Sequence, residues 1–305
     1  MDKLEAMRRF VLVANSASFT KAAESLGLPK SSISSAIQGL ENSLGTRLLH
    51  RSTRSVRLTQ DGEAYLPQCR NILVELDALE SQFQHTRDEV KGVLRVDMPS
   101  RFASTVVLPH LHDFSQTYPR LQFKISSADH RVDLVKEGID CAIRVGKLFD
   151  SSLIAKPLTR YRIINCVSPG YAQLHGVPDS LEALSRHRLI DYSPPLTAGD
   201  AMFEYIKNDQ LHHYSMASSL AVNGTDAYLS ACLHGLGIAQ IPAMGVLKYL
   251  QSGQLISFLP QYEAEPMPVN VLYPSRRQLP KRLVLFMEWL HALMITNNPQ
   301  QCGLA

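Results

Sequence analysis

The chain has 305 residues, 45% of them hydrophobic, and a formal net charge of +3, so it is long enough for two or three domains with their own cores. No apolar run approaches the roughly 20 residues of a membrane-spanning helix, so no membrane partner is predicted. The five cysteines are scattered, without a CxxC or other close pair, so neither a disulfide framework nor a zinc site is indicated and buried thiols are predicted.

The N-terminus is predicted not to direct export. Lys3, Arg8 and Arg9 precede the short apolar run FVLVA, an order that a secretory signal also has. The five apolar residues, however, fall short of the roughly 7–15 of a signal's apolar region, and Glu5 interrupts the basic start. We therefore expect a cytoplasmic protein.

Positive charge is concentrated at the start of the chain. Between Met1 and Leu58 there are nine Lys and Arg but four Asp and Glu, a net charge of +5, so the remainder carries −2 of the total +3. From Asn42 to Gln60 there are four arginines, His50 and no acid. A basic segment on a near-neutral body favours a polyanionic partner, with an ordinary solvated basic face as the alternative.

Three helices are predicted in the first 45 residues. Apolar residues recur at a helical period over Leu4–Asn15. A short helix follows over Phe19–Gly27, where glycine suits the left-handed conformation at a helix end. After Pro29 a third helix runs to Leu44, before Gly45. Two short helices joined by a tight glycine turn form a helix-turn-helix pattern.

The third helix has two different faces. Its apolar residues fall in one narrow sector, which is predicted to face the core: Ile33, Ile37, Leu40 and Leu44. The opposite side carries hydroxyls and amides, with no Glu or Lys from Ser31 to Gly39, and such short polar groups can approach base edges in a major groove. The alternative is a plain exposed polar face. The predicted DNA-binding residues here are Lys30, Ser31, Ser34, Ser35 and Gln38.

A small β-hairpin, or wing, is predicted at Thr53–Leu58. Guanidinium groups on or beside it can neutralise phosphates or enter a minor groove. The predicted DNA-binding residues of this region are Arg51, Thr53, Arg54 and Arg57.

A long helix is predicted over Gln60–Thr86, with Thr59 as its cap. Its apolar residues are spaced alternately by four and three, which is a heptad seam: Tyr65, Cys69, Ile72, Leu76, Leu79 and Phe83. The simplest partner for such a seam is a second copy of the chain, which would place two DNA-binding heads on one duplex. Packing against the chain's own body is the alternative.

From residue 93 onward, strands and helices alternate, which predicts α/β units. The predicted strands are Val93–Asp97, Leu121–Ser126, Asp140–Val145, Arg162–Val167, Ala217–Val222 and Pro268–Tyr273. The predicted helices are Thr105–Thr117, Asp133–Glu137, Asp226–His234 and Lys281–Met294.

A small-molecule site is predicted where strands of this region end and helices begin. Its amides, hydroxyls and guanidinium groups suit a small anion such as a carboxylate. Each residue also has a structural alternative, since Ser and Asn commonly cap helices and Arg144 can pair with an acidic neighbour. The predicted effector-binding residues are Ser100, Arg101, Ser126, Ser127, Arg144, Asn223, Gly224 and Thr225.

Taken together, FVLVANSASFTKAAESLG, ISSAIQGLENSLGTRLL and HRSTRSVRLTQDG resemble the LysR-type transcriptional regulators, and weaker similarity continues through YPRLQFKI, DLVKEGIDCAIRVG, SPGYAQLHGVP and GLGIAQIP. Two positions depart from the family pattern. Pro29-Lys30 replaces a common Ser-Gln pair, which implies a different operator preference, and Leu49-His50 replaces a common phenylalanine and its neighbour.

This resemblance implies a winged helix-turn-helix domain at residues 1–58, a linker and dimerisation helix at 59–88, and an effector-binding α/β domain at 89–305. The last is expected to resemble a periplasmic binding protein, with subdomain I at about 91–165 and 268–305 and subdomain II at about 166–267. The chain is expected to cross between them near 165–168 and to return near 266–270. A homodimer or homotetramer is implied as well.

No enzyme, cofactor or metal chemistry is predicted. GxSxG, HExxH and Walker motifs are absent, and the pairs His110/His112 and His212/His213 point to different faces. The sequence favours a regulator that binds a pseudo-palindromic site on double-stranded DNA and responds to a small molecule. The alternative is a solute-binding protein or enzyme with an additional N-terminal domain.

Overall fold

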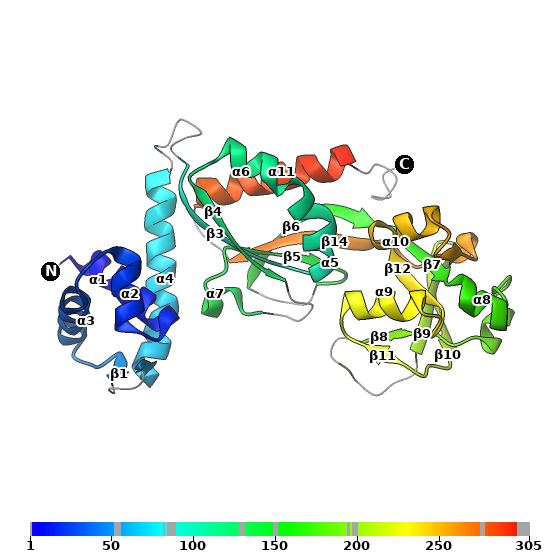
Figure 1. Ribbon diagram of the computed structural model, residues 1–305, viewed down its shortest axis with the longest axis horizontal. Helices are drawn as coiled ribbons and strands as arrows, with labels where there is room; N and C mark the ends of the chain where they lie inside the picture. Colours follow the sequence, from blue (N-terminus) through cyan, green and yellow to red (C-terminus); the bar gives the residue numbers. More distant parts are fainter. Residues whose placement is uncertain are drawn as a thin grey trace. The chain divides into compact units, whose positions relative to one another are not determined.

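The computed structural model describes residues 2–51, 56–81, 83, 90–127, 132–148, 152–193, 196, 201–274 and 278–297. The chain forms two compact units (Figure 1). The first comprises residues 1–90, 133–139 and 276–284, and the second comprises 91–132, 140–275 and 285–305.

The first unit begins with the three helices that the sequence predicts. Its elements are α1 (Lys3–Ser16), α2 (Phe19–Leu26), α3 (Lys30–Leu44), β1 (Leu49–Arg51), β2 (Val56–Leu58), α4 (Gln60–Ser81) and the short α7 (Leu134–Glu137). The Ser18 side chain caps α2, and Gly27 ends that helix at φ 63°, as predicted. Buried Phe10, Val13 and Ile37 lie in the core that α1, α2 and α3 share with the wing and α4.

Strands β1 and β2 form the predicted wing, with Leu49 opposite Leu58, although the first strand begins earlier than expected. Helix α4 approaches the wing so closely that a Cβ on Gly62 would lie 2.1 Å from the Leu48 carbonyl oxygen, which explains the glycine. The Thr59 hydroxyl accepts a hydrogen bond from the Gly62 amide at 3.0 Å and so caps α4 as predicted. The helix extends to Ser81 and Phe83 lies in a turn, while the end of the predicted range, 84–86, lies outside the described residues.

The second unit has a five-stranded sheet in the order β4-β3-β5-β14-β6, in which β3 is parallel to β4 and β5, and β14 is antiparallel to β5 and β6. Its strands are β3 (Gly92–Met98), β4 (Leu121–Ser127), β5 (Cys141–Val145), β6 (Leu153–Tyr161) and β14 (Met267–Pro274). Strand β6 was not predicted, because Pro157 interrupts its pattern. Proline is tolerated there because β6 is an edge strand and the register shifts opposite Asn270.

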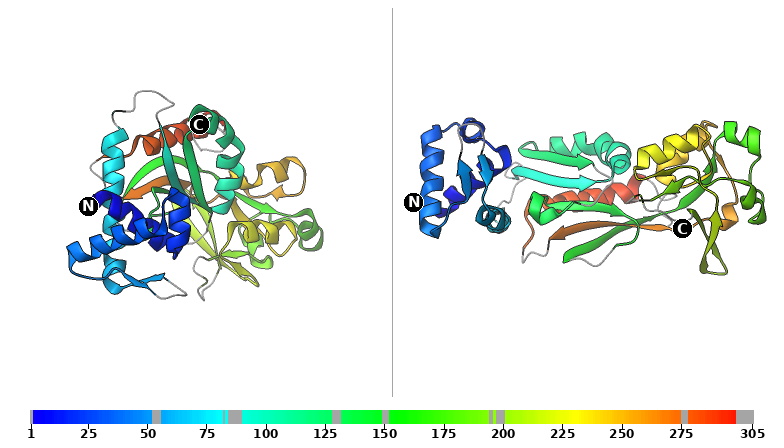
Figure 2. Two further views of the ribbon diagram at one scale, coloured as in Figure 1. Left: turned by 60° about the vertical axis from the view of Figure 1, so that its left-hand side comes forward. Right: turned by 90° about the horizontal axis from the view of Figure 1, so that it is seen from below.

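One helical run follows β3, and its parts are α5 (Ser100–Phe102), the π-helical turn η2 (Ala103–Val107), the 3-10 turn η3 (Leu108–His110) and α6 (Leu111–Thr117). It begins before the predicted start at Thr105, so Ser100 and Arg101 lie in its first turn. Helix α6 lies beside the closing helix α11 (Lys281–Asn297), as both views in Figure 2 show. Phe114 of α6 joins them to the sheet, since its ring contacts Phe123, Phe286 and Trp289.

The other half of the second unit is built on the three-stranded sheet β12-β7-β13. The strands of this half are β7 (Ile163–Val167), β8 (Asp191–Tyr192), β9 (Ala201–Lys207), β10 (Gln210–Met216), β11 (Ala221–Val222), β12 (Ala239–Pro242) and β13 (Ile256–Ser257). Strands β9 and β10 form one separate pair, and β8 and β11 form another. Its helical segments are α8 (Pro169–His175), η4 (Glu182–Arg186), α9 (Thr225–Leu233), α10 (Ala243–Gln251) and η5 (Pro260–Tyr262). The strand predicted over Ala217–Val222 is therefore shorter than expected and consists of β11 alone.

The two halves are linked earlier in the chain than predicted. The chain leaves the five-stranded sheet at Tyr161 and enters the three-stranded sheet at Ile163, ahead of the expected crossing at 165–168. It returns between Tyr262 and Met267. A bidentate ion pair joins the linking segments, because Arg162 Nε and Nη2 donate to the Glu263 carboxylate at 2.6 and 2.7 Å. This contact raises the pKa of Arg162.

Within the described ranges, no helix combines the length and the apolar character that crossing a membrane requires.

Candidate DNA-binding and effector-binding sites

The outer face of α3 carries the predicted DNA-binding side chains. Ile33, Ile37 and Leu40 are fully buried, which fixes the opposite side of the helix outward. On that side Lys30, Ser31, Ser35 and Gln38 are exposed, and Ser34 is half-buried. Glu41, the first acid along α3, points inward, so the outer face presents hydroxyls, amides and one ammonium group.

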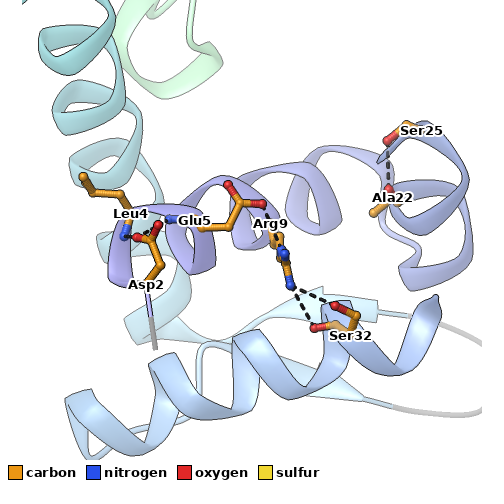
Figure 3. A network of polar contacts seen from close by, with 7 residues as sticks. All are labelled: Asp2, Leu4, Glu5, Arg9, Ala22, Ser25 and Ser32. Atoms are coloured by element: carbon orange, nitrogen blue, oxygen red, sulfur yellow. Dashed lines mark hydrogen bonds and ion pairs between the residues drawn. The ribbon is translucent and has the colours of Figure 1, made fainter. Parts of the chain in front are cut away.

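Helix α1 holds the first turn of α3 (Figure 3). Arg9 Nη1 donates hydrogen bonds to the carbonyl oxygen of Ser32 at 3.2 Å and to its hydroxyl at 3.0 Å. Arg9 Nε pairs with Glu5 at 3.1 Å, one turn earlier in α1. Ser32 thus serves the fold, while Ser31 and Ser35 stay exposed.

A buried carboxylate connects α3 with the wing. Glu41 Oε1 accepts hydrogen bonds from the backbone amides of Leu48 and Leu49, at 2.9 and 3.1 Å. These amides lie where the chain enters β1, so Glu41 fixes the start of the wing relative to the helix.

The wing residues are only partly described. Arg57 is exposed on β2, opposite His50 of β1, where its guanidinium can reach a phosphate. Arg51 lies in β1, but its side chain is outside the described part, as are Thr53 and Arg54.

The predicted seam on α4 divides into two parts. Cys69 is fully buried in the core of its own head and Tyr65 packs against that core, so the prediction of a partner contact is wrong for Cys69. Burial raises the pKa of Cys69 to about 11, which keeps this thiol protonated and unreactive. The second part is outward-facing: Ile72, Leu79 and Phe83 are exposed, and Leu76 is half-buried.

Three of the segments predicted to bind the effector lie at two places in the second unit. Ser126 and Ser127 end β4 and are paired with Asp97 and Met98 of β3, next to the turn that leads to Ser100. Ser100 and Arg101, by contrast, contact residues of the other half. The Ser100 and Thr225 hydroxyls are 3.2 Å apart, and Thr225 is the first residue of α9.

Asp226, which the sequence prediction missed, completes this contact. Arg101 Nη1 donates to Asp226 Oδ1 at 3.1 Å, and the Ser100 hydroxyl donates to Asp226 Oδ2 at 3.1 Å. Arg101 Nη2 also donates to the carbonyl oxygen of Gly245 at 2.9 Å. The sequence did carry a signal that Asp226 lies at a helix start, because the helix dipole favours an acid in the first turn of a helix.

Arg144 has the structural role that was considered as an alternative. Its Nη2 lies 2.6 Å from Asp97 Oδ2, and the Asp97 side chain is fully buried. Asp97 pairs with Ala142 across the sheet, so Arg144 lies two residues farther along on the same face of β5. Because Arg144 neutralises a buried carboxylate, it adds little positive charge for a ligand. Asn223 is exposed and Gly224 caps α9.

No metal centre emerges from the side chains that the structure describes, since His, Cys, Asp and Glu nowhere gather in threes there. The side chains of Cys69, Cys141, Cys166 and Cys232 are buried, as the sequence predicted, and none of the four is in a disulfide. The interaction with the neighbouring Cys232 raises the pKa of Cys166, and burial raises it further.

Comparison with known proteins identifies both parts of the chain. Residues 4–63 match the family described as bacterial regulatory helix-turn-helix protein, lysR family, and residues 87–294 match the LysR substrate binding domain. The chain is 40% identical over 294 residues to the uncharacterized HTH-type transcriptional regulator YhjC of Escherichia coli K12, covering 96% of this chain and 98% of that protein. It is 37% identical to an HTH-type transcriptional repressor of Pseudomonas aeruginosa UCBPP-PA14, and the match covers 97% of this chain and 94% of that repressor.

A similar solved structure is that of CrgA, a LysR-type transcriptional regulator from Neisseria meningitidis. It has a TM-score of 0.60 and 29% sequence identity, and the match covers 94% of this chain and 97% of CrgA.

Proposed function

Since the chain belongs to the LysR-type transcriptional regulators, a family of DNA-binding proteins and not of enzymes, we propose that it binds a pseudo-palindromic operator and responds to a small anionic effector. Its DNA partner implies that it works in the cytoplasm. The effector is proposed to bind between the two halves of the second unit, where α5 and α9 meet.

The outer face of α3 is the observation that carries the DNA-binding part of this proposal. The face is polar and lacks acids, and it is held outward by three buried apolar residues and by Arg9. In a major groove, Gln38 would pair with a base edge, the serines would allow close approach, and Lys30 would reach a phosphate or a guanine. Arg57 would neutralise a phosphate beside the groove.

The exposed part of the α4 seam supports pairing of two chains. Ile72 and Leu79 of α4, and Phe83 in the turn after it, expose apolar surface. A dimer formed through these residues would present two copies of α3, which matches a two-fold symmetric operator.

A gel-shift titration of genomic fragments with salt, followed by footprinting, tests the proposal. A regulator of this kind loses affinity steeply as salt rises and protects two half-sites. Metabolites are then screened for a changed footprint, with carboxylates expected among the active compounds. Weak binding that is equal on all fragments would contradict a sequence-specific regulator. Activity confined to cations would contradict an anionic effector.

A further inference from the structure

Arg101 connects three helical segments of the second unit. It lies in α5, its Nη1 donates to Asp226 in α9, and its Nη2 donates to the carbonyl oxygen of Gly245 in α10. The Ser100 hydroxyl donates to the second carboxylate oxygen of Asp226. Asp226 therefore accepts from two consecutive residues of α5.

These contacts join the two halves of the second unit. Ser100 and Arg101 follow β3 of the five-stranded sheet, whereas α9 precedes and α10 follows β12 along the chain in the other half. The covalent links between the halves are the segments at Arg162 and at 263–266. Any motion that separates α5 from α9 must break the bonds of Asp226.

The two charged partners differ in their access to water. The Arg101 side chain is 15% exposed, and its Nε is buried with no hydrogen-bond partner among the described residues. The Asp226 side chain is 65% exposed. The carboxylate can thus leave into solvent at small cost, while the guanidinium stays largely buried and requires another anion. Asp226 is the replaceable member of the pair.

We propose that Arg101 and Asp226 form an autoinhibitory latch, in which Asp226 occupies the place on Arg101 that the carboxylate of the effector takes. This inference rests on the proposed function, because it assumes an anionic effector between the two halves. The arriving carboxylate accepts from Arg101 and Ser100, the side chain of Asp226 turns to solvent, and α9 is released from α5. Asp226 then sets both the resting state and the affinity for anions.

Hydrogen exchange of the full-length protein without added ligand tests the latch. In Asp226→Ala, amides of residues 100–107 and 225–229 are expected to exchange about threefold faster, the effect of losing a partly exposed ion pair. Asp113→Asn is the matched control, because Asp113 is also an exposed first-turn acid, in α6, and its loss leaves these amides unchanged. Unchanged exchange in Asp226→Ala overturns the latch.

A charge reversal separates the ion pair from general loosening. Arg101→Glu is expected to speed exchange at the same amides, and adding Asp226→Arg is expected to slow it again. If the double variant exchanges as fast as Arg101→Glu or faster, the ion pair does not hold the halves together.

Footprinting without effector tests the regulatory role, on a genomic fragment that the wild type binds. Asp226→Ala is expected to change the protected pattern, and Asp113→Asn to keep it. Faster exchange with an unchanged footprint overturns the latch as a regulatory device. A wild type that protects no fragment overturns the proposed function instead, while the exchange data still report whether the contact holds.

Discussion

Arg9 and Ser32 are joined by two hydrogen bonds, since one guanidinium nitrogen of α1 donates to both the carbonyl and the hydroxyl oxygen at the start of α3. α3 lacks a side-chain cap, because Pro29 stands at the capping position. The contact from Arg9 therefore does part of what a cap would do, and it fixes how far α3 is rotated. The polar row from Ser31 to Gln38 depends on that rotation.

Arg9→Gln is expected to weaken operator binding about fivefold, equivalent to about 1 kcal/mol, because α3 loses its anchor while keeping its own side chains. Binding to random DNA should change less. Arg8→Gln is the control: it removes the same charge, but Arg8 pairs with Asp77 of α4. Gel shifts at one salt concentration measure both affinities. Equal losses in the two variants would show that the charge matters and the anchor does not.

Glu41→Ala is expected to lower the free energy of unfolding by about 1–3 kcal/mol, because two backbone amides lose their acceptor in a buried place. Urea unfolding measures this change. Glu24→Ala, an exposed acid on α2, serves as the control and should stay within about 0.5 kcal/mol of the wild type. A Glu41 variant as stable as this control would mean that water replaces the carboxylate.

Gln38→Ala and Arg57→Ala are expected to affect DNA binding differently. Loss of the Gln38 amide should reduce the preference for the operator over random DNA by about 1–3 kcal/mol. Loss of Arg57 should weaken binding to all DNA and lower the slope of log affinity against log salt by about 0.9. Salt titrations on both DNAs separate the two effects. Identical behaviour of the variants would contradict this division between base and phosphate contacts.

Leu79→Glu is expected to weaken self-association about tenfold or more, because it places an unpaired charge in the proposed apolar interface. Sedimentation of the full-length protein measures the change. Leu174→Glu is the control: Leu174 is also exposed and apolar, but it lies on α8 in the second unit. If the Leu174 variant dissociates and the Leu79 variant does not, α4 is not the main interface.

Local patterns carried most of what the sequence predicted correctly. Helix period, glycine at Gly27 and the Thr59 cap act within a few residues, so α1, α2, α3 and the start of α4 could be predicted. Cys69 shows the limit of such a pattern. A heptad spacing gives the face of a helix but does not say whether that face meets the same chain or another, and the head covers Cys69.

Contacts distant in sequence could not be predicted. Asp226 is 125 residues from Arg101, and no local signal pairs them. Arg144 is paired with Asp97, so its charge is not available to a ligand. Only the register of β3 and β5 reveals that the two residues lie on one face. The expected positive charge at Arg144 was therefore neutralised by a residue that the sequence did not associate with it.

His187 is expected to make the second unit less stable in mild acid. Its side chain is buried, its Nδ1 has no hydrogen-bond partner among the described residues, and its ring lies 5.8 Å from that of Tyr171. Burial lowers the pKa of His187, and the charges of His175 and Arg186 lower it further. A base with a lowered pKa in the folded state binds its proton more readily when unfolded, so its contribution is complete above the unfolded value of about 6.5 and is lost as the pH falls toward the folded value.

Urea unfolding at pH 7.5 and 5.5 measures this loss in the wild type and in His187→Phe, which keeps a ring beside Tyr171 but cannot be protonated. The difference in stability between the two pH values should be smaller in His187→Phe, because the variant no longer carries the buried base. His291→Asn removes an exposed histidine from α11 and is the control, expected to keep the wild-type difference. Should His187→Phe lose as much stability as the wild type, the acid sensitivity arises from other groups and not from this imidazole.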